Sequence, residues 1–527
     1  MARRAARCQV ARPLLAACCA LLLYVPFLSR RFDPNGIRDA LAVDRGGAAL
    51  WNPNHLLYRP IGAGLDAAAR SLDLGVRSMA PLQELSALNG AITVGLALLI
   101  CWRLCGDWLA SALAAGLLAT SWAQWSFSTD ATYVTMGAAA AAAAIAWVLA
   151  TDGSTRSVCA GGVLCALAVL SWEANIFLLP VLAARLWMIY PERRLRAGVV
   201  LTAACGGAVL SADYAAAAAR AGTRVSLGSV VEWASLHGGG GTTLPMWGVW
   251  STEHIASAGH AWMSSLLPLW EGLGLRGLAR GELRGDKVLS QLAALALLGL
   301  VVVSVRLAWP ARRRGRLSRS TFLWFAAGVG AYLPFIVWWV PAPQWFLVPN
   351  LFLAGAAAIV WSEAQARLRL GLALAIATIA AANFSATIWP AHVGVSPHDA
   401  LARCVVAQIE PRDLVVVTDW GWLDHAEYWY GVPADVLYLV DGRPREEKLG
   451  LLAEALERTR ARGGRGYVME VDRHAPEKVA WLQALTQLLP EDLDRFAPRP
   501  AFTCAGVPFV ELTGESQSDG GGRVDRR

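Results

Sequence analysis

Apolar residues form long, nearly uninterrupted runs over the first three quarters of the chain, separated by short polar or basic connections. About 20 apolar residues cross the hydrocarbon core of a bilayer, so we predict eleven membrane-spanning helices. The predicted spans are about Pro13–Ser29, Ala87–Leu104, Trp108–Trp125, Thr132–Ala150, Val158–Ser171, Ala174–Tyr190, Ala197–Ala219, Val288–Ala308, Thr321–Val340, Trp345–Trp361 and Leu370–Trp389. Several are rich in alanine and glycine, a composition that lets membrane helices pack backbone to backbone.

The pattern changes at Ala391, where the chain becomes polar and short apolar segments alternate with amphipathic ones. This alternation predicts a small α/β domain over residues 391–513, after a membrane domain over residues 1–390. The expected helices are Asp399–Ile409, Glu446–Arg462 and Pro476–Leu489, and the expected strands are Leu414–Thr418, Val436–Val440, Gly466–Val471 and Pro508–Leu512. The polar, glycine-rich end, Gly514–Arg527, is predicted to be a disordered tail.

Composition agrees with a membrane protein, because only 17% of the residues are charged and 56% are hydrophobic, whereas a soluble domain has about 25% charged residues. The ten cysteines show no metal-binding spacing, and most lie in or beside apolar runs, where thiols pack as small hydrophobic groups. Cys404 and Cys504 lie in the polar C-terminal domain and would pair if that domain is outside the cytoplasm. No glycine-rich phosphate motif is present, so nucleotide binding is not expected.

Basic residues gather on alternate connections, which orients the chain by the positive-inside rule. The rule places the N-terminus in the cytoplasm, and eleven spans place the C-terminal domain outside, in an integral protein of the cell membrane. The N-terminal arginines resemble those of a signal peptide, but the apolar run after them continues to Leu28 and favours an uncleaved first helix. The opposite connections carry acids and most of the 24 tryptophans, which points to a binding region on the outer face.

The outer loop at residues 30–86 carries the densest polar chemistry in the chain. Asp33 lies just beyond the end of the first span, and a carboxylate fixed at that depth is suited to act as a general base. Partial desolvation would raise its pKa towards neutral pH. Asp39 is the second candidate and Asp44 the third. The simpler interpretation is that these acids are solvated loop residues.

The same loop contains the segment Asn54–Pro60, with a histidine, a tyrosine and an arginine. His55 and Arg59 would share one face if the segment is helical, and together they would form a small cationic site suited to a phosphate. Alternatively, the segment is a juxtamembrane turn in which Tyr58 and Arg59 extend to the membrane surface.

Two further acids, Asp130 and Glu173, lie at the outer ends of predicted spans. Acids in or beside membrane segments are energetically costly and often functional. The simpler interpretation of Asp130 is an N-cap of the following helix. Gln344 and Trp345 follow a pair of prolines that predicts a tight turn, and we expect them at the rim of the same cavity.

A long outer segment at residues 220–287 separates the seventh and eighth spans. Its four glycines, Gly238–Gly241, predict a flexible hinge and not a phosphate-binding loop, because no strand precedes them. The half-apolar stretch Ile255–Leu275 predicts a re-entrant or interfacial helix, or part of an additional pair of spans.

These segments together resemble the GT-C class of membrane glycosyltransferases, which includes protein O-mannosyltransferases and aminoarabinose transferases. FDPNG, with Asp33, resembles the acid of their first outer loop, and NPNHLLYRP resembles a His-Pro-Pro-Gly-x-Pro-Leu-Tyr segment of bacterial members. STDATY, with Asp130 and Tyr133, WEANIFLLP and WWVPAPQWFLVP resemble three later segments. The chain departs from the pattern at Pro34, where many members have a second acid, and in the replacement of His-Pro-Pro-Gly by His-Leu-Leu-Tyr.

The resemblance implies a polytopic α-helical protein that transfers a sugar, with inversion, from a polyprenyl-phosphate donor to a lipid, glycan or protein acceptor at the outer face. It implies that the base is Asp33 or Asp39, and that substrate and phosphate contact His55, Tyr58, Arg59, Asp130, Tyr133, Glu173, Gln344 and Trp345. Neither a cofactor nor a metal is indicated, and no nucleic acid is expected as a partner.

Two other classes of protein fit parts of the pattern. A transporter would place ionisable residues or broken helices near the middle of the bilayer and often shows related halves. The centres of the predicted spans here are nearly free of charge, and no internal repeat is evident. A non-catalytic membrane scaffold or sensor would display the C-terminal domain and would not need Asp33.

Overall fold

The structure, a computed structural model, describes residues 2–75, 77–190, 192–221, 226–230, 250–267, 288–315, 318–339, 341–419, 421–441 and 443–514. Its compact units divide between Gly394 and Val395, beside the boundary predicted at residue 390. We call the part before this point the membrane unit and the part after it the C-terminal unit. The predicted hinge Gly238–Gly241 and, apart from Gly514, the predicted tail lie outside the described residues.

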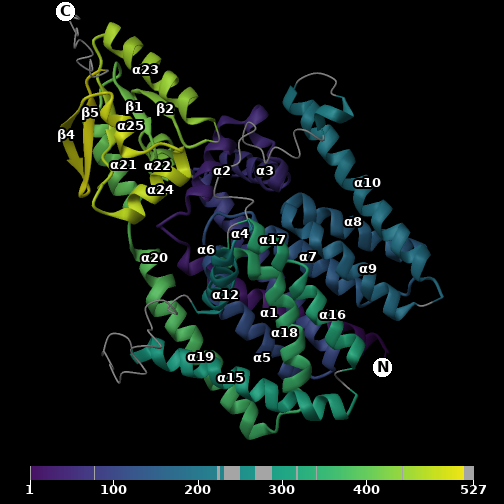
Figure 1. Ribbon diagram of the computed structural model, residues 1–527. Coiled ribbons are helices and arrows are strands. Elements are labelled where there is room, and N and C mark those ends of the chain that lie inside the picture. The colour runs from purple at the N-terminus through teal and green to yellow at the C-terminus, as the bar shows by residue number, and fades with distance from the viewer. Residues whose placement is uncertain are drawn as a thin grey trace, which may run out of the picture. The chain divides into compact units, whose positions relative to one another are not determined.

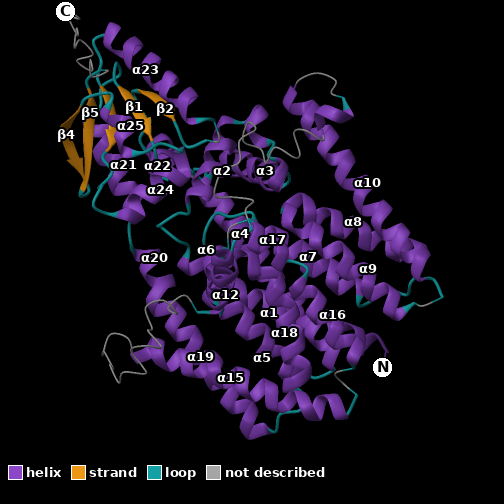
Figure 2. Ribbon diagram, in the orientation of Figure 1, coloured by secondary structure: helices purple, strands orange, loops and turns teal. Residues whose placement is uncertain are grey.

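Helices make up the membrane unit (Figures 1 and 2). Each predicted span overlaps one or two of them: α1 (Ala2–Tyr24), α4 (Met79–Cys105), α5 (Trp108–Thr120), α6 (Trp122–Thr129), α7 (Val134–Val148), α8 (Thr155–Ser171), α9 (Leu178–Ile189), α10 (Arg194–Ala221), α15 (Val288–Arg313), α16 (Arg319–Gly330), α17 (Leu333–Trp338), α18 (Leu347–Trp361) and α19 (Ala366–Asn383). Seven helical segments of the described chain are long and apolar enough to cross a membrane, and three apolar helices are shorter. The polytopic α-helical fold is thereby confirmed, while the number of crossings stays a prediction.

Small residues let these helices approach closely, as their composition suggested. A Cβ atom at Gly95 of α4 would lie 2.7 Å from the carbonyl oxygen of Pro13 in α1. A Cβ atom at Gly162 of α8 would lie 2.7 Å from the carbonyl oxygen of Leu201 in α10. Both separations are too short for a side chain, so α4 and α10 pack backbone to backbone against their neighbours.

The segment between α1 and α4 is mostly helical and not an open loop. It contains α2 (Pro34–Arg45), the 3₁₀ turns η2 (Gly47–Leu50) and η3 (Pro53–His55), and α3 (Tyr58–Ser71). Asp33 is the N-cap of α2 and Pro34 follows at the first helical position, a combination that favours a helix start. Asp33 and Pro34 therefore initiate α2 within a segment for which the sequence predicts an outer loop.

Only part of the long outer segment belongs to the described residues. There α12 (Thr252–Leu266) covers the first half of the predicted stretch Ile255–Leu275. Its Trp262 donates a hydrogen bond to Asn350 of α18 (3.2 Å) and its His254 ring lies 2.9 Å from the Val337 carbonyl oxygen of α17. The helix is thus packed into the membrane unit.

The C-terminal unit is the predicted small α/β domain. Its sheet has the order β2-β1-β3-β5-β4, with β1 parallel to β2 and β3, and β5 antiparallel to β3 and β4. The strands are β1 (Leu414–Val417), β2 (Asp435–Tyr438), β3 (Gly466–Met469), β4 (Pro498–Cys504) and β5 (Val507–Leu512). The helices are α21 (Pro397–Gln408), α22 (Trp422–Trp429), α23 (Arg445–Ala461), α24 (Pro476–Thr486) and α25 (Pro490–Asp494).

Successive residues of β1 enter two different cores, which makes this unit a three-layer structure. Leu414 and Val416 pack with residues of α23, and Val415 and Val417 pack with residues of α21 and α22. A disulfide joins Cys404 of α21 to Cys504 of β4 with their Cα atoms 5.4 Å apart. It ties the edge strand to a helix of the second layer.

Candidate functional site

The segment that follows α1 is joined to the end of α6 by a buried hydrogen-bond network. The Ser29 N–H donates to the Thr129 carbonyl oxygen (2.7 Å). Gln83 of α4 donates its side-chain amide to the carbonyl oxygens of Ser29 (2.7 Å) and Thr129 (3.3 Å). Because Asp33 and Asp130 follow these two tied residues, Gln83 fixes the positions from which both acids extend.

The two acids are in direct contact. The Asp33 N–H donates to Asp130 Oδ2 (2.9 Å), and Asp130 Oδ1 accepts the N–H of Ala131 (2.8 Å). Asp33 uses its own Oδ1 to cap α2 at the N–H of Asn35 (2.8 Å). Phe32, just before Asp33, has a φ of +32°, a region that bulky residues seldom adopt and that is often found at functional sites.

This environment favours protonation of both carboxyl groups, which lie outside the membrane-spanning helices. Burial, followed by the negative charge of Asp33, raises the pKa of Asp130 to about 7. Burial also raises the pKa of Asp33, although hydrogen bonds from Asn35 oppose it. Asp130 is therefore able to change its protonation near neutral pH. The simple prediction of an N-cap does not describe Asp130, because Asp130 ends α6 and Tyr133 precedes α7.

Asp39, six residues beyond Asp33 in α2, forms a buried ion pair. Its Oδ1 accepts a hydrogen bond from Arg59 Nε (2.7 Å) and lies 3.1 Å from His55 Nε2. Burial alone would raise the pKa of Asp39, but the electrostatic attraction and hydrogen bonds of His55 and Arg59 hold it at about 2. Burial lowers the pKa of His55, although the attraction of Asp39 opposes this shift. The environment therefore favours an Asp39 anion beside a neutral His55.

The predicted i, i+4 arrangement of His55 and Arg59 on one helix is wrong. His55 ends η3, and Arg59 lies in the first turn of α3. The two side chains meet because both reach Asp39, whose charge neutralises Arg59. Arg59 also donates from Nη1 to the Ala49 carbonyl oxygen (3.0 Å), and its Nη2 group makes no hydrogen bond with the described residues.

Tyrosines surround this ion pair. The His55 ring stacks on Tyr133 with their centroids 3.9 Å apart and their planes 5° apart. Tyr58 meets the edge of Tyr133 at 6.4 Å and shares a hydrogen bond with Ser86 of α4 (3.1 Å). His55 Nδ1 is buried and has no hydrogen-bond partner among the described residues. This edge of the ring therefore carries a nitrogen that is available to a ligand.

The three remaining predicted residues lie around or beyond this cluster. Glu173 begins η4 (Glu173–Phe177) and lies within electrostatic range of the Tyr133 hydroxyl. Trp345, in η6 (Pro343–Phe346), stacks on Trp172 with their centroids 5.4 Å apart. Gln344 makes no side-chain hydrogen bond with the described residues, so the structure does not join it to the aspartates.

Sequence reasoning missed Gln83 and Ser86, which position the cluster. Ser86 Oγ lies 3.0 Å from both the N–H and the carbonyl oxygen of Thr132. The apolar pattern predicts the start of the second span at Ala87, which leaves both residues in the predicted outer loop. The available signal was a glutamine and a serine at the start of a helical apolar pattern, where polar groups need a partner.

No group of three or more histidine, cysteine or acidic side chains in the described part of the chain could hold a metal ion. The nearest arrangement, Asp39 with His55, is already neutralised by Arg59. The expectation that the protein needs no metal stays a prediction.

Comparison with known proteins establishes the fold. No protein-family model matches the sequence, and no curated protein matches it. Among solved structures, ArnT from Cupriavidus metallidurans bound to undecaprenyl phosphate is similar, with a TM-score of 0.54 and 12% identity over 96% of this chain and 99% of ArnT. The archaeal oligosaccharyltransferase AglB from Archaeoglobus fulgidus, in complex with an inhibitory peptide and a dolichol-phosphate, gives a TM-score of only 0.45, with 12% identity over 97% of this chain and 74% of AglB. The chain is therefore an integral membrane protein with the GT-C fold of the aminoarabinose transferase ArnT, as its sequence predicted.

Proposed function

We propose that the protein is a glycosyltransferase that moves a sugar from a polyprenyl-phosphate donor to an acceptor at the outer face of the membrane, with inversion. The observation that carries the proposal is the Asp33–Asp130 contact (2.9 Å), beside the Asp39–His55–Arg59 cluster. It occurs in a fold whose neighbour ArnT is bound to undecaprenyl phosphate. A donor of this type fits a membrane protein that lacks a nucleotide-binding motif.

Asp33 is the general base in this proposal. Only its Oδ1 is engaged by a hydrogen bond within the described chain, which leaves Oδ2 for an acceptor hydroxyl or amine. Burial raises its pKa, and a base works best when its pKa is close to the working pH. Asp39 is a poor base, because its pKa is about 2 and it is only 2% exposed. We assign Asp39 the task of holding His55 and Arg59, and Asp130 that of holding the Asp33 backbone.

The proposed reaction is a single displacement at the sugar. The acceptor oxygen or nitrogen forms a bond to the anomeric carbon and gives its proton to Asp33, while the bond from that carbon to the phosphate oxygen breaks. The polyprenyl phosphate leaves with the bonding electrons. The Nη2 group of Arg59 makes no hydrogen bond with the described residues and is available to stabilise the negative phosphate. His55 Nδ1, which has no partner among those residues, would become a second donor once it is protonated. Tyr58, Tyr133, Glu173 and Trp345 would line the sugar side.

The C-terminal unit supports an outward orientation. Its Cys404–Cys504 disulfide belongs to a type of bond that persists in oxidising compartments and is rare in the cytosol. With the basic connections in the cytoplasm, the C-terminal unit would lie outside and the N-terminus inside. Asp33 and Asp130 would then be at the outer membrane surface.

The test compares Asp33→Asn with Asp44→Asn in isolated membranes supplied with radiolabelled polyprenyl-phosphate sugars. Asp44 is a matched control, because it belongs to α2 but is exposed, and its one ion pair among the described residues is with Arg70 (3.2 Å). We expect Asp33→Asn to lower transfer by about 10²- to 10⁴-fold, the usual contribution of a general base, and Asp44→Asn to transfer normally. Full transfer by Asp33→Asn would overturn the base assignment. Acceptor-independent sugar movement across sealed vesicles would instead indicate a transporter.

A further inference from the structure

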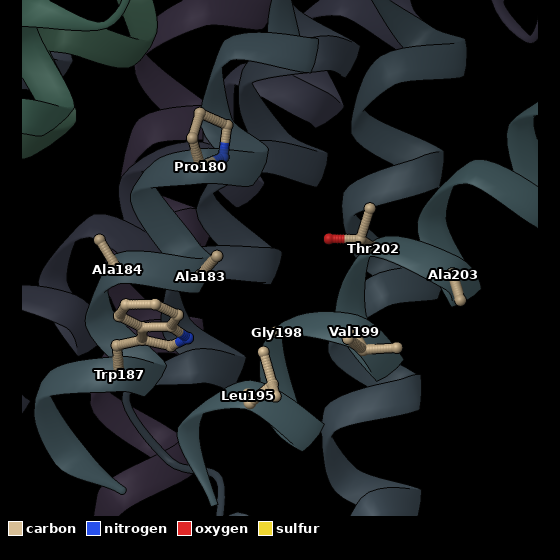
Figure 3. Close-up of a pocket in the computed structure, with 9 residues that line it drawn as sticks. All are labelled: Pro180, Ala183, Ala184, Trp187, Leu195, Gly198, Val199, Thr202 and Ala203. Carbon is tan, nitrogen blue, oxygen red and sulfur yellow. The ribbon is translucent and has the colours of Figure 1, made fainter. Parts of the chain in front are cut away.

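An open apolar groove lies between α9 and α10 (Figure 3). Its volume is about 610 Å³, and its walls include Pro180, Ala183 and Trp187 of α9 and Leu195, Gly198 and Thr202 of α10. Figure 3 shows the Thr202 hydroxyl directed towards the space between the two helices. Thr202 and the Trp187 indole are the only side chains of the lining with a polar atom, so the groove suits a hydrocarbon chain.

The depth of the groove matches one leaflet of a bilayer. Leu195 and Ala203 both line it, and eight residues of helix span about 12 Å. One half of the hydrocarbon core is roughly 15 Å thick. Leu195 is the second residue of α10, so the groove occupies the part of this helix next to the basic connection that precedes it. In the proposed orientation Asp33 and Asp130 lie at the opposite surface of the membrane, and the groove is in the leaflet remote from them.

The end of the groove near Leu195 is basic. Arg193 lies two residues before Leu195 and Arg196 directly follows it, and both arginines are exposed. Arg196 lies three and seven residues before Val199 and Ala203, which line the groove, and this spacing puts it on the groove face of α10. Glu192 is exposed nearby and Asp152 interacts with Arg193. Arg196 forms no ion pair within the described residues.

We propose that this groove binds an acidic phospholipid of the cytoplasmic leaflet, with one acyl chain between α9 and α10 and the headgroup phosphate at Arg193 and Arg196. Basic pockets between membrane helices on the cytoplasmic side are suited to anionic headgroups. The lipid would fill the space that α9 and α10 leave open, and so would hold α10 against the bundle. The site does not depend on the proposed glycosyltransferase reaction, because it lies in the other leaflet.

The test measures lipid binding to the purified full-length protein by native mass spectrometry. The probes are dioleoyl phosphatidylglycerol, dioleoyl phosphatidylcholine and undecaprenyl phosphate. We expect the phosphatidylglycerol to bind at least tenfold more tightly than the phosphatidylcholine. The double variant Arg193→Gln/Arg196→Gln should lose most of this preference, about fivefold for each arginine, and Arg156→Gln on the neighbouring basic connection should keep it.

A second pair of variants tests the groove itself. A Cβ at Gly198 would lie 3.3 Å from Trp187 Nε1, whereas a Cβ at Gly206 on the same helix meets open space. Gly198→Phe should therefore lower phosphatidylglycerol affinity at least tenfold, and Gly206→Phe should not. Val199→Trp provides a second way to fill the groove at a residue that is 60% exposed. The proposal is overturned by equal binding of both phospholipids, by equal losses in Gly198→Phe and Gly206→Phe, or by selective loss of undecaprenyl phosphate alone.

Discussion

Replacement of Gln83 by leucine should distinguish the role of Gln83 in positioning Asp33 and Asp130 from its contribution to the stability of the helix bundle. Leucine has a similar size but cannot donate the hydrogen bonds that Gln83 makes to Ser29 (2.7 Å) and Thr129 (3.3 Å). The Thr129 carbonyl keeps a second donor, the Ser29 N–H (2.7 Å), whereas the Ser29 carbonyl loses the only donor described for it. One buried unsatisfied carbonyl costs about 1–3 kcal/mol, so we expect a loss of about 2 kcal/mol in unfolding free energy.

The effect on transfer should be much larger than this loss of stability. A displacement of about 1 Å at a catalytic group lowers the rate by roughly 10²-fold, so kcat should fall at least tenfold while binding of undecaprenyl phosphate changes little. Gln124→Leu is the matched control, since Gln124 is also buried and donates to Gly90 (3.3 Å) and Ser128 (3.2 Å). Its unfolding should change by a similar amount, with kcat within about twofold of the wild type. Equal losses of kcat in the two variants would refute the positioning role of Gln83.

Three further perturbations have defined outcomes. Asp39→Asn should lower the unfolding free energy by about 3–5 kcal/mol, because it leaves Arg59 buried without an anion. A loss of melting temperature no larger than that of Asp44→Asn would contradict the buried ion pair. Asp130 has a folded-state pKa of about 7 against an ordinary value of 3.8, so between these pH values the folded state binds a proton that the unfolded state has lost. The unfolding free energy should therefore fall by up to about 4 kcal/mol as the pH rises from 4 to 7. Chemical unfolding of Asp130→Asn should not show this decline. Replacement of Cys404 and Cys504 together by alanine should cost about 2–4 kcal/mol, seen in the full-length protein as faster proteolysis of the C-terminal unit, and unchanged proteolysis would argue against the disulfide.

The membrane helices could be predicted from the sequence because each consists of a continuous run of apolar residues, which is a local signal. The same locality explains the strands it predicted in the C-terminal unit and the one it missed. β4 carries Pro498 and Pro500, and proline normally argues against a strand because it lacks a donor. The sheet tolerates both prolines because β4 is an edge strand that pairs only with β5.

The candidate site was harder to predict because its chemistry depends on contacts distant in the chain. Asp33 was recognisable from its position after the first span, but its neighbour Asp130 is 97 residues away. The choice between Asp33 and Asp39 also required the fold, since nothing local shows that Arg59 and His55 both reach Asp39. This contact lowers the pKa of Asp39, while burial raises that of Asp33. Two aspartates six residues apart thereby acquire opposite protonation behaviour, which is the division of tasks that a base and a structural anion require.

The ion pair also limits how the site can hold a phosphate. Asp39 cancels one positive charge, so the cluster of Asp39, His55 and Arg59 carries no net charge while His55 is neutral. A bound phosphate would favour protonation of His55 and would raise its pKa, which converts the cluster into a cation only when the phosphate is present. Donor binding should therefore take up a proton, and isothermal titration with undecaprenyl phosphate in buffers of different ionisation enthalpy measures this directly. Proton uptake that persists in His55→Gln would assign the titration to another group.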